Sequence, residues 1–206
     1  PANQQVIVEK KNAAGVFAYQ HFFPKQKTKW EDITAQIKGN WKHWENDFVD
    51  FNVQYLIPHE QSTRGPKLAV ADVDNDGFDD FYVCGAKFQP GALMIQQANG
   101  SFVSSDTALF NRYAGWEDVD ATFFDANNDG FPDLYVVSGG NEYDDGNSML
   151  ADRLYINDGN GHFNIASDAL PGIYTNKSCV SVSDIDKDGD NDLFVGGLAG
   201  SKTYGY

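Results

Sequence analysis

Three short acidic segments carry the residues whose types and spacing point to chemistry in this chain of 206 residues. They read DVDNDGFDD from residue 72, DANNDGFPD from residue 125 and DIDKDGDND from residue 184. Each has the form D-x-[DN]-x-D-G-x-x-D, so oxygen atoms at alternate positions can converge on one cation where the backbone curls. The Gly at position six allows that sharp turn, because it accepts a backbone conformation that other residues resist. The pattern predicts three cation sites built from oxygen ligands.

The ligands follow from position in the segment. Side chains at positions one, three, five and nine are expected to bind the cation, and a backbone carbonyl at position seven and waters would complete its shell. All-oxygen ligation with flexible geometry favours Ca²⁺ over Mg²⁺ and Zn²⁺, so we expect about three Ca²⁺ per chain. The side-chain ligands are Asp72, Asp74, Asp76 and Asp80; Asp125, Asn127, Asp129 and Asp133; and Asp184, Asp186, Asp188 and Asp192. The carbonyls are those of Phe78, Phe131 and Asp190.

Two other interpretations of the segments are less favoured. An EF-hand needs a Glu at position twelve and a helix on each side. Position twelve is Val83, Val136 and Val195, and the flanks are short, aromatic and β-branched, as in strands. Asx-rich turns without metal are the second alternative. Three loops in the same register with the same Gly argue against it, because carboxylates held a few ångström apart repel one another unless a cation neutralises them.

The acidity of the chain is local. Thirteen of its 30 acidic residues lie in the three segments, and without those 13 charges the net charge of −15 would be −2. This charge argues against a nucleic-acid ligand, because neutralising phosphates needs clustered Lys and Arg, and an anionic membrane surface is disfavoured for the same reason. No apolar run approaches the roughly 18 residues of a transmembrane helix, so no membrane insertion is expected.

The acidic segments belong to a longer repeat. Residues 68–86, 121–140 and 180–198 align, and their first aspartates, at 72, 125 and 184, lie 53 and 59 residues apart. That period suits one four-stranded propeller blade. Each segment is expected to join two strands, such as 68–71 and 80–84. Hairpin patterns with Asn-Gly or Gly-Asn-Gly turns follow at 92–105 and 153–167.

The fold predicted is all-β, a partial propeller of about three blade-equivalents of four antiparallel strands each. A further hairpin pattern at 6–20 has no acidic segment before it. An insertion follows, with a short helix at 33–37, and its Trp30, Trp41 and Trp44 either pack on the propeller face or form an aromatic ligand platform. Residues 1–206 are thus one propeller fragment, with the second half of a blade (6–23), an inter-blade insertion (24–67), two blades (68–110 and 119–168) and the first half of another (178–206).

These motifs resemble the FG-GAP/VCBS repeats of integrin-α-like β-propellers. The resemblance rests on the three acidic segments with their following apolar strands and on the NDGNGHF hairpin, and it covers about 68–198 and 6–20. The stretch from Asp47 to Gly77 further resembles bacterial outer-surface or secreted members of this group. The resemblance implies a Ca²⁺-stabilised propeller used for adhesion, ligand binding or as a scaffold. With about three blade-equivalents, a closed ring would need further copies or the remainder of a longer propeller.

No catalytic constellation is expected. The sequence has no G-x-S-x-G motif, and its four histidines show no metal-like spacing with Cys or one another. Cys84 is expected to be a buried thiol, and a disulfide with Cys179 stays open. We therefore expect a non-catalytic adhesion or protein-interaction scaffold, with a carbohydrate-binding propeller or a calcium-dependent lyase or hydrolase as the alternatives.

The expected compartment follows from the cation. Calcium loops of extracellular modules bind with dissociation constants on the order of 10⁻⁴–10⁻³ M, so they fill outside the cell and stay largely empty in cytosol. We expect the protein to be extracellular, on the cell surface or in the periplasm. The partner expected is an unidentified extracellular protein or glycan, and open strand edges also favour homo-oligomers.

Overall fold

The computed structural model describes residues 41–200 continuously, and before them residues 9–12, 15, 16, 18, 23, 30, 32 and 34. The chain forms two compact units, Pro1–Ile33 and Thr34–Tyr206. The described part of the first unit contains a 3₁₀ helix, η1, over Lys10–Asn12. Most of the expected hairpin at 6–20 and of the short helix at 33–37 lies outside the described residues.

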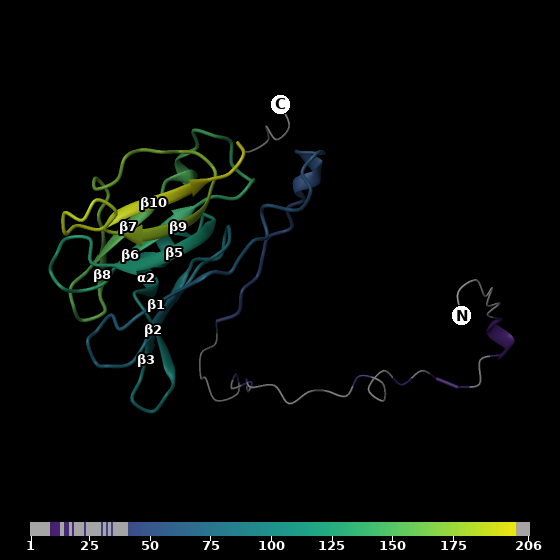
Figure 1. The fold of residues 1–206 in the computed structure, drawn as a ribbon, viewed down its shortest axis with the longest axis horizontal. Helices are drawn as coiled ribbons and strands as arrows, with labels where there is room; N and C mark the ends of the chain where they lie inside the picture. The colour runs from purple at the N-terminus through teal and green to yellow at the C-terminus, as the bar shows by residue number, and fades with distance from the viewer. Residues whose placement is uncertain are drawn as a thin grey trace. The chain divides into compact units, whose positions relative to one another are not determined.

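Three antiparallel sheets make up the described part of the second unit (Figure 1). Two of them have four strands in sequence order, and the third has two. The first contains β1 (Leu68–Ala71), β2 (Asp80–Val83), β3 (Ala92–Gln96) and β4 (Phe102–Ser105). The second contains β5 (Asp118–Phe124), β6 (Asp133–Ser138), β7 (Arg153–Asn157) and β8 (Phe163–Ile165), and the third β9 (Lys177–Ser183) and β10 (Asp192–Gly197).

The helices in this unit are short and lie in the connections. They are α2 (Thr107–Phe110) and the 3₁₀ helices η2 (Asp50–Asn52), η3 (Asn111–Tyr113) and η4 (Ser148–Leu150). No helix within the described residues is both long and apolar enough to cross a membrane.

The three aligned segments of the sequence have the same strand pairing in the structure. Ala71 pairs with Asp80, Phe124 with Asp133 and Ser183 with Asp192, so the same pairing closes all three acidic segments. We call these segments loop 1 (72–80), loop 2 (125–133) and loop 3 (184–192). The predicted strand–loop–strand units and the hairpins that follow the first two of them are confirmed.

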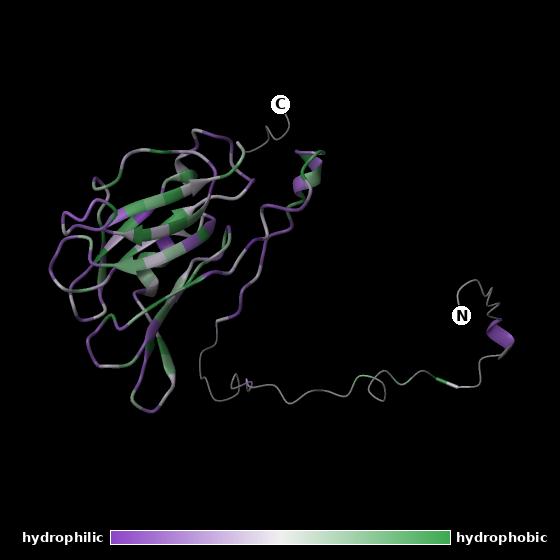
Figure 2. Cartoon of the chain, in the orientation of Figure 1, coloured by the Kyte–Doolittle hydropathy of each residue, from purple (hydrophilic) through white to green (hydrophobic). Residues whose placement is uncertain are grey.

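Apolar side chains between neighbouring sheets form the core. One cluster joins the first two sheets and includes Tyr82, Leu93, Leu134 and Tyr155, all almost fully buried. A second cluster packs the second sheet against β9 and β10. Strand β6 is buried along its whole length, which explains why LYVV lacks an apolar/polar alternation. Figure 2 shows the apolar residues concentrated in the strands of these sheets.

The most extensive contacts between sheets are made by the first strand of each repeat. Strand β5 contacts both β1 and β9, as expected where the innermost strands of successive blades surround a common axis. The fold is therefore part of a β-propeller, as the sequence predicts, with two complete four-stranded blades and half of another in the described residues.

Smaller predictions have mixed outcomes. Cys84 is a buried free thiol, as expected, and Cys179 is free and exposed, so the two are not joined. Trp41 packs against the cluster of Val83, Ala92 and Met94, as one interpretation of the insertion predicts. Trp44 is 48% exposed and does not share that burial.

A buried carboxyl, that of Glu117, lies directly before β5. The pKa of Glu117 is raised to about 9, mainly by burial and also by the charges of Glu45, Asp118 and Glu142, against the N–H of Lys87, 2.7 Å from Oε2, which lowers it. The unfolded chain ionises this group near its ordinary pKa of 4.5. The folded state therefore holds an extra proton between these two values, and its stability falls as the pH rises from the lower value to the higher.

We expect Glu117→Gln to raise the melting temperature by an amount that grows from about pH 5 to about pH 9. A neutral amide of the same shape removes the cost of keeping a carboxyl protonated. Thermal melts followed by circular dichroism across this range measure the effect, with Glu60→Gln at an exposed position as the control. A gain that does not change with pH would contradict the prediction.

Candidate metal centre

The first carboxylate of each loop organises the backbone around it. In loop 1, Oδ1 of Asp72 accepts the N–H of Asp76 (3.1 Å) and Oδ2 accepts that of Gly77 (2.9 Å). The same pair of bonds recurs at Asp125 (3.1 and 2.8 Å) and at Asp184 (3.2 Å each). Each loop thus curls toward its first aspartate without any partner from another element.

The side-chain oxygens at positions three, five and nine accept the same hydrogen bonds in all three loops. The side chain at position three accepts the N–H of position five, and the carboxylate at position five accepts the N–H of position seven at 2.9 Å in every loop. The carboxylate at position nine accepts the N–H of position two, at 2.8–3.0 Å. Three sequences that differ at positions two, three, four, seven and eight therefore fold into one hydrogen-bond pattern.

Two positions in each loop have a left-handed backbone. The Gly at position six has φ of 88°, 89° and 100° in the three loops, which confirms the expected sharp turn. Position four, for which the sequence pattern predicts nothing, is also left-handed, with φ of 60° at Asn75, 61° at Asn128 and 65° at Lys187. Asn tolerates this conformation, whereas Lys is strained in it.

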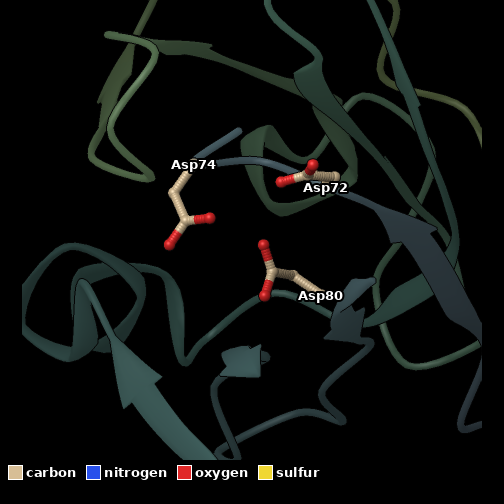
Figure 3. A group of neighbouring side chains, drawn as sticks. All are labelled: Asp72, Asp74 and Asp80. Carbon is tan, nitrogen blue, oxygen red and sulfur yellow. The ribbon is translucent and has the colours of Figure 1, made fainter. Parts of the chain in front are cut away.

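Carboxylate oxygens converge in loops 1 and 3. Asp72, Asp74 and Asp80 each offer an oxygen within 4.8 Å of the others, and Figure 3 shows the three carboxylates facing a common space. In loop 3 the group is Asp184, Asp186 and Asp188. Asp76 and Asp192, which complete the predicted sets, fall outside these groups.

Loop 2 is arranged differently at its third position. Asn127 Nδ2 donates to Asp129 Oδ2 at 2.8 Å. The amide of Asn127 thus partly satisfies the Asp129 carboxylate, which in a loaded loop would bind the cation. Asp125, Asp129 and Asp133 keep the backbone bonds of the other loops. Loop 2 has the same scaffold with one fewer negative charge than loop 1 at the predicted positions.

Positions seven and nine have roles in the loop itself. Phe78, Phe131 and Asp190 donate their N–H groups within the loop, and ligation by their carbonyls stays a prediction. Asp80 and Asp133 are fully buried. Their second oxygens accept the N–H groups of Gln96 (2.7 Å) and Asn157 (2.8 Å), which anchors each loop to the last residue of β3 or β7.

The electrostatics favour a cation. Burial raises the pKa of Asp74, and the charges of Asp76 and Asp72 raise it further, against the N–H of Asp76, which lowers it. Burial is also the main cause of the raised pKa of Asp80 and of Asp133. Each of these groups is charged at a cost that a nearby cation would offset. Convergent carboxylate oxygens with no nitrogen or sulfur donor fit Ca²⁺.

Sequence reasoning missed Asn157, which lies at the end of β7. Its side chain is 2% exposed, and Nδ2 donates to the carbonyl of Val73 in loop 1 at 2.8 Å. The NDGNGHF motif marks this residue only as the start of a turn. Its partner lies 84 residues away, so no local pattern could have identified the contact.

We expect Lys187→Asn to stabilise the metal-free protein by about 0.5–1 kcal/mol, because Asn tolerates the left-handed backbone at position four. Urea unfolding in the presence of a chelator measures the change. Lys187→Ala removes the same charge without relieving the strain and is the control. Equal stability of the two variants would contradict the explanation.

Comparison with models of protein families finds a match to the FG-GAP-like repeat over residues 72–136 and again over 125–195. Comparison with curated proteins gives no match. Each matched range starts at the first aspartate of one loop and extends past the next loop into the strand that follows, so the family repeat coincides with the structural one. Together the ranges span more than half of the chain. The chain belongs to the FG-GAP-like repeat family and is a propeller-like repeat module.

Proposed function

We propose that this module binds Ca²⁺ through its three acidic loops and acts as a non-catalytic scaffold for adhesion or protein interaction outside the cell. The observation that carries the proposal is the threefold recurrence of one loop geometry, with carboxylate oxygens of Asp72, Asp74 and Asp80 within 4.8 Å of one another. Bacterial surface or secreted proteins are the setting that the sequence resemblance favours.

A bound Ca²⁺ would supply the positive charge that offsets repulsion among the carboxylates of a loop. The chain's own residues determine where that charge acts. Asp72 directly follows β1, and Asp80 is the first residue of β2, so their carboxylates lie at the ends of two paired strands. Holding both at one point fixes the strand–loop–strand unit. Because the unfolded chain lacks this arrangement, binding stabilises the fold by mass action.

The compartment follows from affinity. Loops of this kind in extracellular modules have dissociation constants on the order of 10⁻⁴–10⁻³ M, which external calcium satisfies. The predicted ligands account for nearly all the acidic residues of the three loops. We therefore assign these carboxylates to metal binding rather than to acid–base catalysis.

The ligand-binding surface we propose lies at the ends of the sheets opposite the loops. A pocket of about 270 Å³ there is lined by residues that include Asn141 after β6, Asn176 before β9 and Arg64. The segment carrying Arg64 is held by buried Asp50, whose Oδ2 accepts the N–H groups of Gln61 and Ser62 (3.1 Å each) and the hydroxyl of Ser62 (2.6 Å). A fixed loop next to a pocket suits recognition of a partner.

Carbohydrate binding is the second candidate function, and the half-exposed Trp44 favours it. An exposed indole offers a flat apolar face of the kind on which sugar rings stack. If this function holds, a glycan array gives specific signals that Trp44→Ala removes while the melting temperature stays unchanged. An array without specific signals would leave protein interaction as the proposed function.

We expect Asp74→Asn to weaken Ca²⁺ binding at loop 1 at least roughly tenfold, about 1.4 kcal/mol, because affinity follows the number of charged ligands. Loop 2 carries Asn naturally at the same position, so the loop should still fold. Calorimetric titration of the chelator-treated protein measures the change.

Asp79→Asn is the matched control for this experiment. It removes one negative charge from the same loop at an exposed position outside the converging group. If both variants lose affinity equally, the loop attracts calcium only through its net charge, and the proposed ligand set is wrong.

A further inference from the structure

Hydrogen bonds connect the three acidic loops to one another. Each loop is closed by its own backbone bonds, so these connections are not needed to shape it. They join loop 1 to loop 2 through Asn157, and loop 2 to loop 3 through Asn128 and Asn191. Loop 2 therefore shares bonds with both of its neighbours.

The connection between loops 1 and 2 is buried. Asn157 donates its backbone N–H to Asp133 Oδ1 in loop 2 (2.8 Å) and its Nδ2 to the carbonyl of Val73 in loop 1 (2.8 Å). The N–H of Val73 in turn donates to Asp80 Oδ2 at 3.0 Å. One short path thus joins the ninth-position carboxylates of two neighbouring loops, with Asn157 only 2% exposed.

The connection between loops 2 and 3 is reciprocal and exposed. Asn128 Nδ2 donates to Asp190 Oδ1 at 3.0 Å, and Asn191 Nδ2 donates to the carbonyl of Asp125 at 3.3 Å. Each loop therefore offers one amide donor and one acceptor to the other. Water competes for these groups, so this connection should be weaker than the buried one.

We propose that Asn157, Asn128 and Asn191 couple the three loops, so that ordering one loop around its cation raises the affinity of the next. This rests on the proposed calcium function. A cation that fixes one loop also fixes the atoms to which the neighbouring loop is hydrogen-bonded. Binding of the second cation then costs less conformational entropy. The coupling acts equally in both directions, as linkage requires.

Electrostatics opposes this coupling. A cation in one loop weakens the negative field at the next, which lowers affinity there. The loops are largely solvent-exposed, and at an ionic strength of 0.15 M such fields fall off over about 8 Å. Hydrogen-bond coupling persists as salt is raised further, whereas the electrostatic term declines. The net cooperativity is therefore positive at 0.15 M and grows with salt.

The test is a thermodynamic cycle on the full chain after chelator treatment, with Ca²⁺ titrated by calorimetry. Asp72→Ala disables loop 1. Because loop 1 is coupled to loop 2, we expect this change to reduce the affinity of loop 2 about tenfold, within the range usual for coupled sites. In an Asn157→Ala background only the electrostatic term remains, so the same change should leave the affinity of loop 2 unaltered or slightly higher.

Matched controls lie at the equivalent positions of the preceding repeat. Gln96 donates its backbone N–H to Asp80 as Asn157 does to Asp133, so Gln96→Ala should leave the coupling intact. For the exposed connection, Asn128→Gly keeps the left-handed backbone and removes the bond to Asp190, and Asn75→Gly is its counterpart in loop 1. Asn128→Gly should weaken the coupling of loops 2 and 3, assessed by disabling loop 3 with Asp184→Ala.

The outcomes separate this inference from the proposed function. If the unmodified chain binds no Ca²⁺, the proposed function fails. If it binds with independent sites, or if the Asn157→Ala background keeps the full coupling, the function stands and the inference is wrong. Should Asn157→Ala not fold, the exposed Asn128→Gly and Asn191→Ala variants decide the question.

Discussion

The crowding of carboxylates in three short loops is the constraint on which the rest of the structure depends. Carboxylate oxygens converge in loops 1 and 3, and in loop 1 burial and mutual repulsion disfavour the charge of Asp74. Backbone N–H groups satisfy many of the oxygens, but an N–H carries only a partial charge. A divalent cation would balance the remainder, which is why we propose that the loops are binding sites rather than turns.

The sheets depend on the loops because each loop joins the strands that pack between blades. Strand β5 contacts both β1 and β9, and the loops lie at the ends of these three strands. Buried Asp80 and Asp133 continue the connection to β3 and β7. At the opposite end, Asp118 joins the first two sheets through Tyr82, Gly85 and Arg153. Polar anchors thus hold both ends of an apolar interface.

Much of the fold follows from local sequence. The alternation in 92–105 and the turn-forming Asn-Gly specify a hairpin, and Gly at position six specifies the loop. The strained position of Lys187 could not be predicted, because only the folded loop imposes the left-handed backbone there. The bridge through Asn157 and the buried Glu117 depend on residues brought together from distant repeats. Such contacts are hard to predict from sequence, because neither residue of the pair belongs to a periodic pattern or a local motif that marks the contact.

Calcium titration of the chelator-treated chain by calorimetry, with thermal melts on the same samples, tests the central claim most directly. Three loops of one geometry predict about three sites per chain and a large rise in melting temperature as they fill. Absence of binding, or binding that leaves the melting temperature unchanged, would contradict the claim. The aspartates would then serve only to shape the turns.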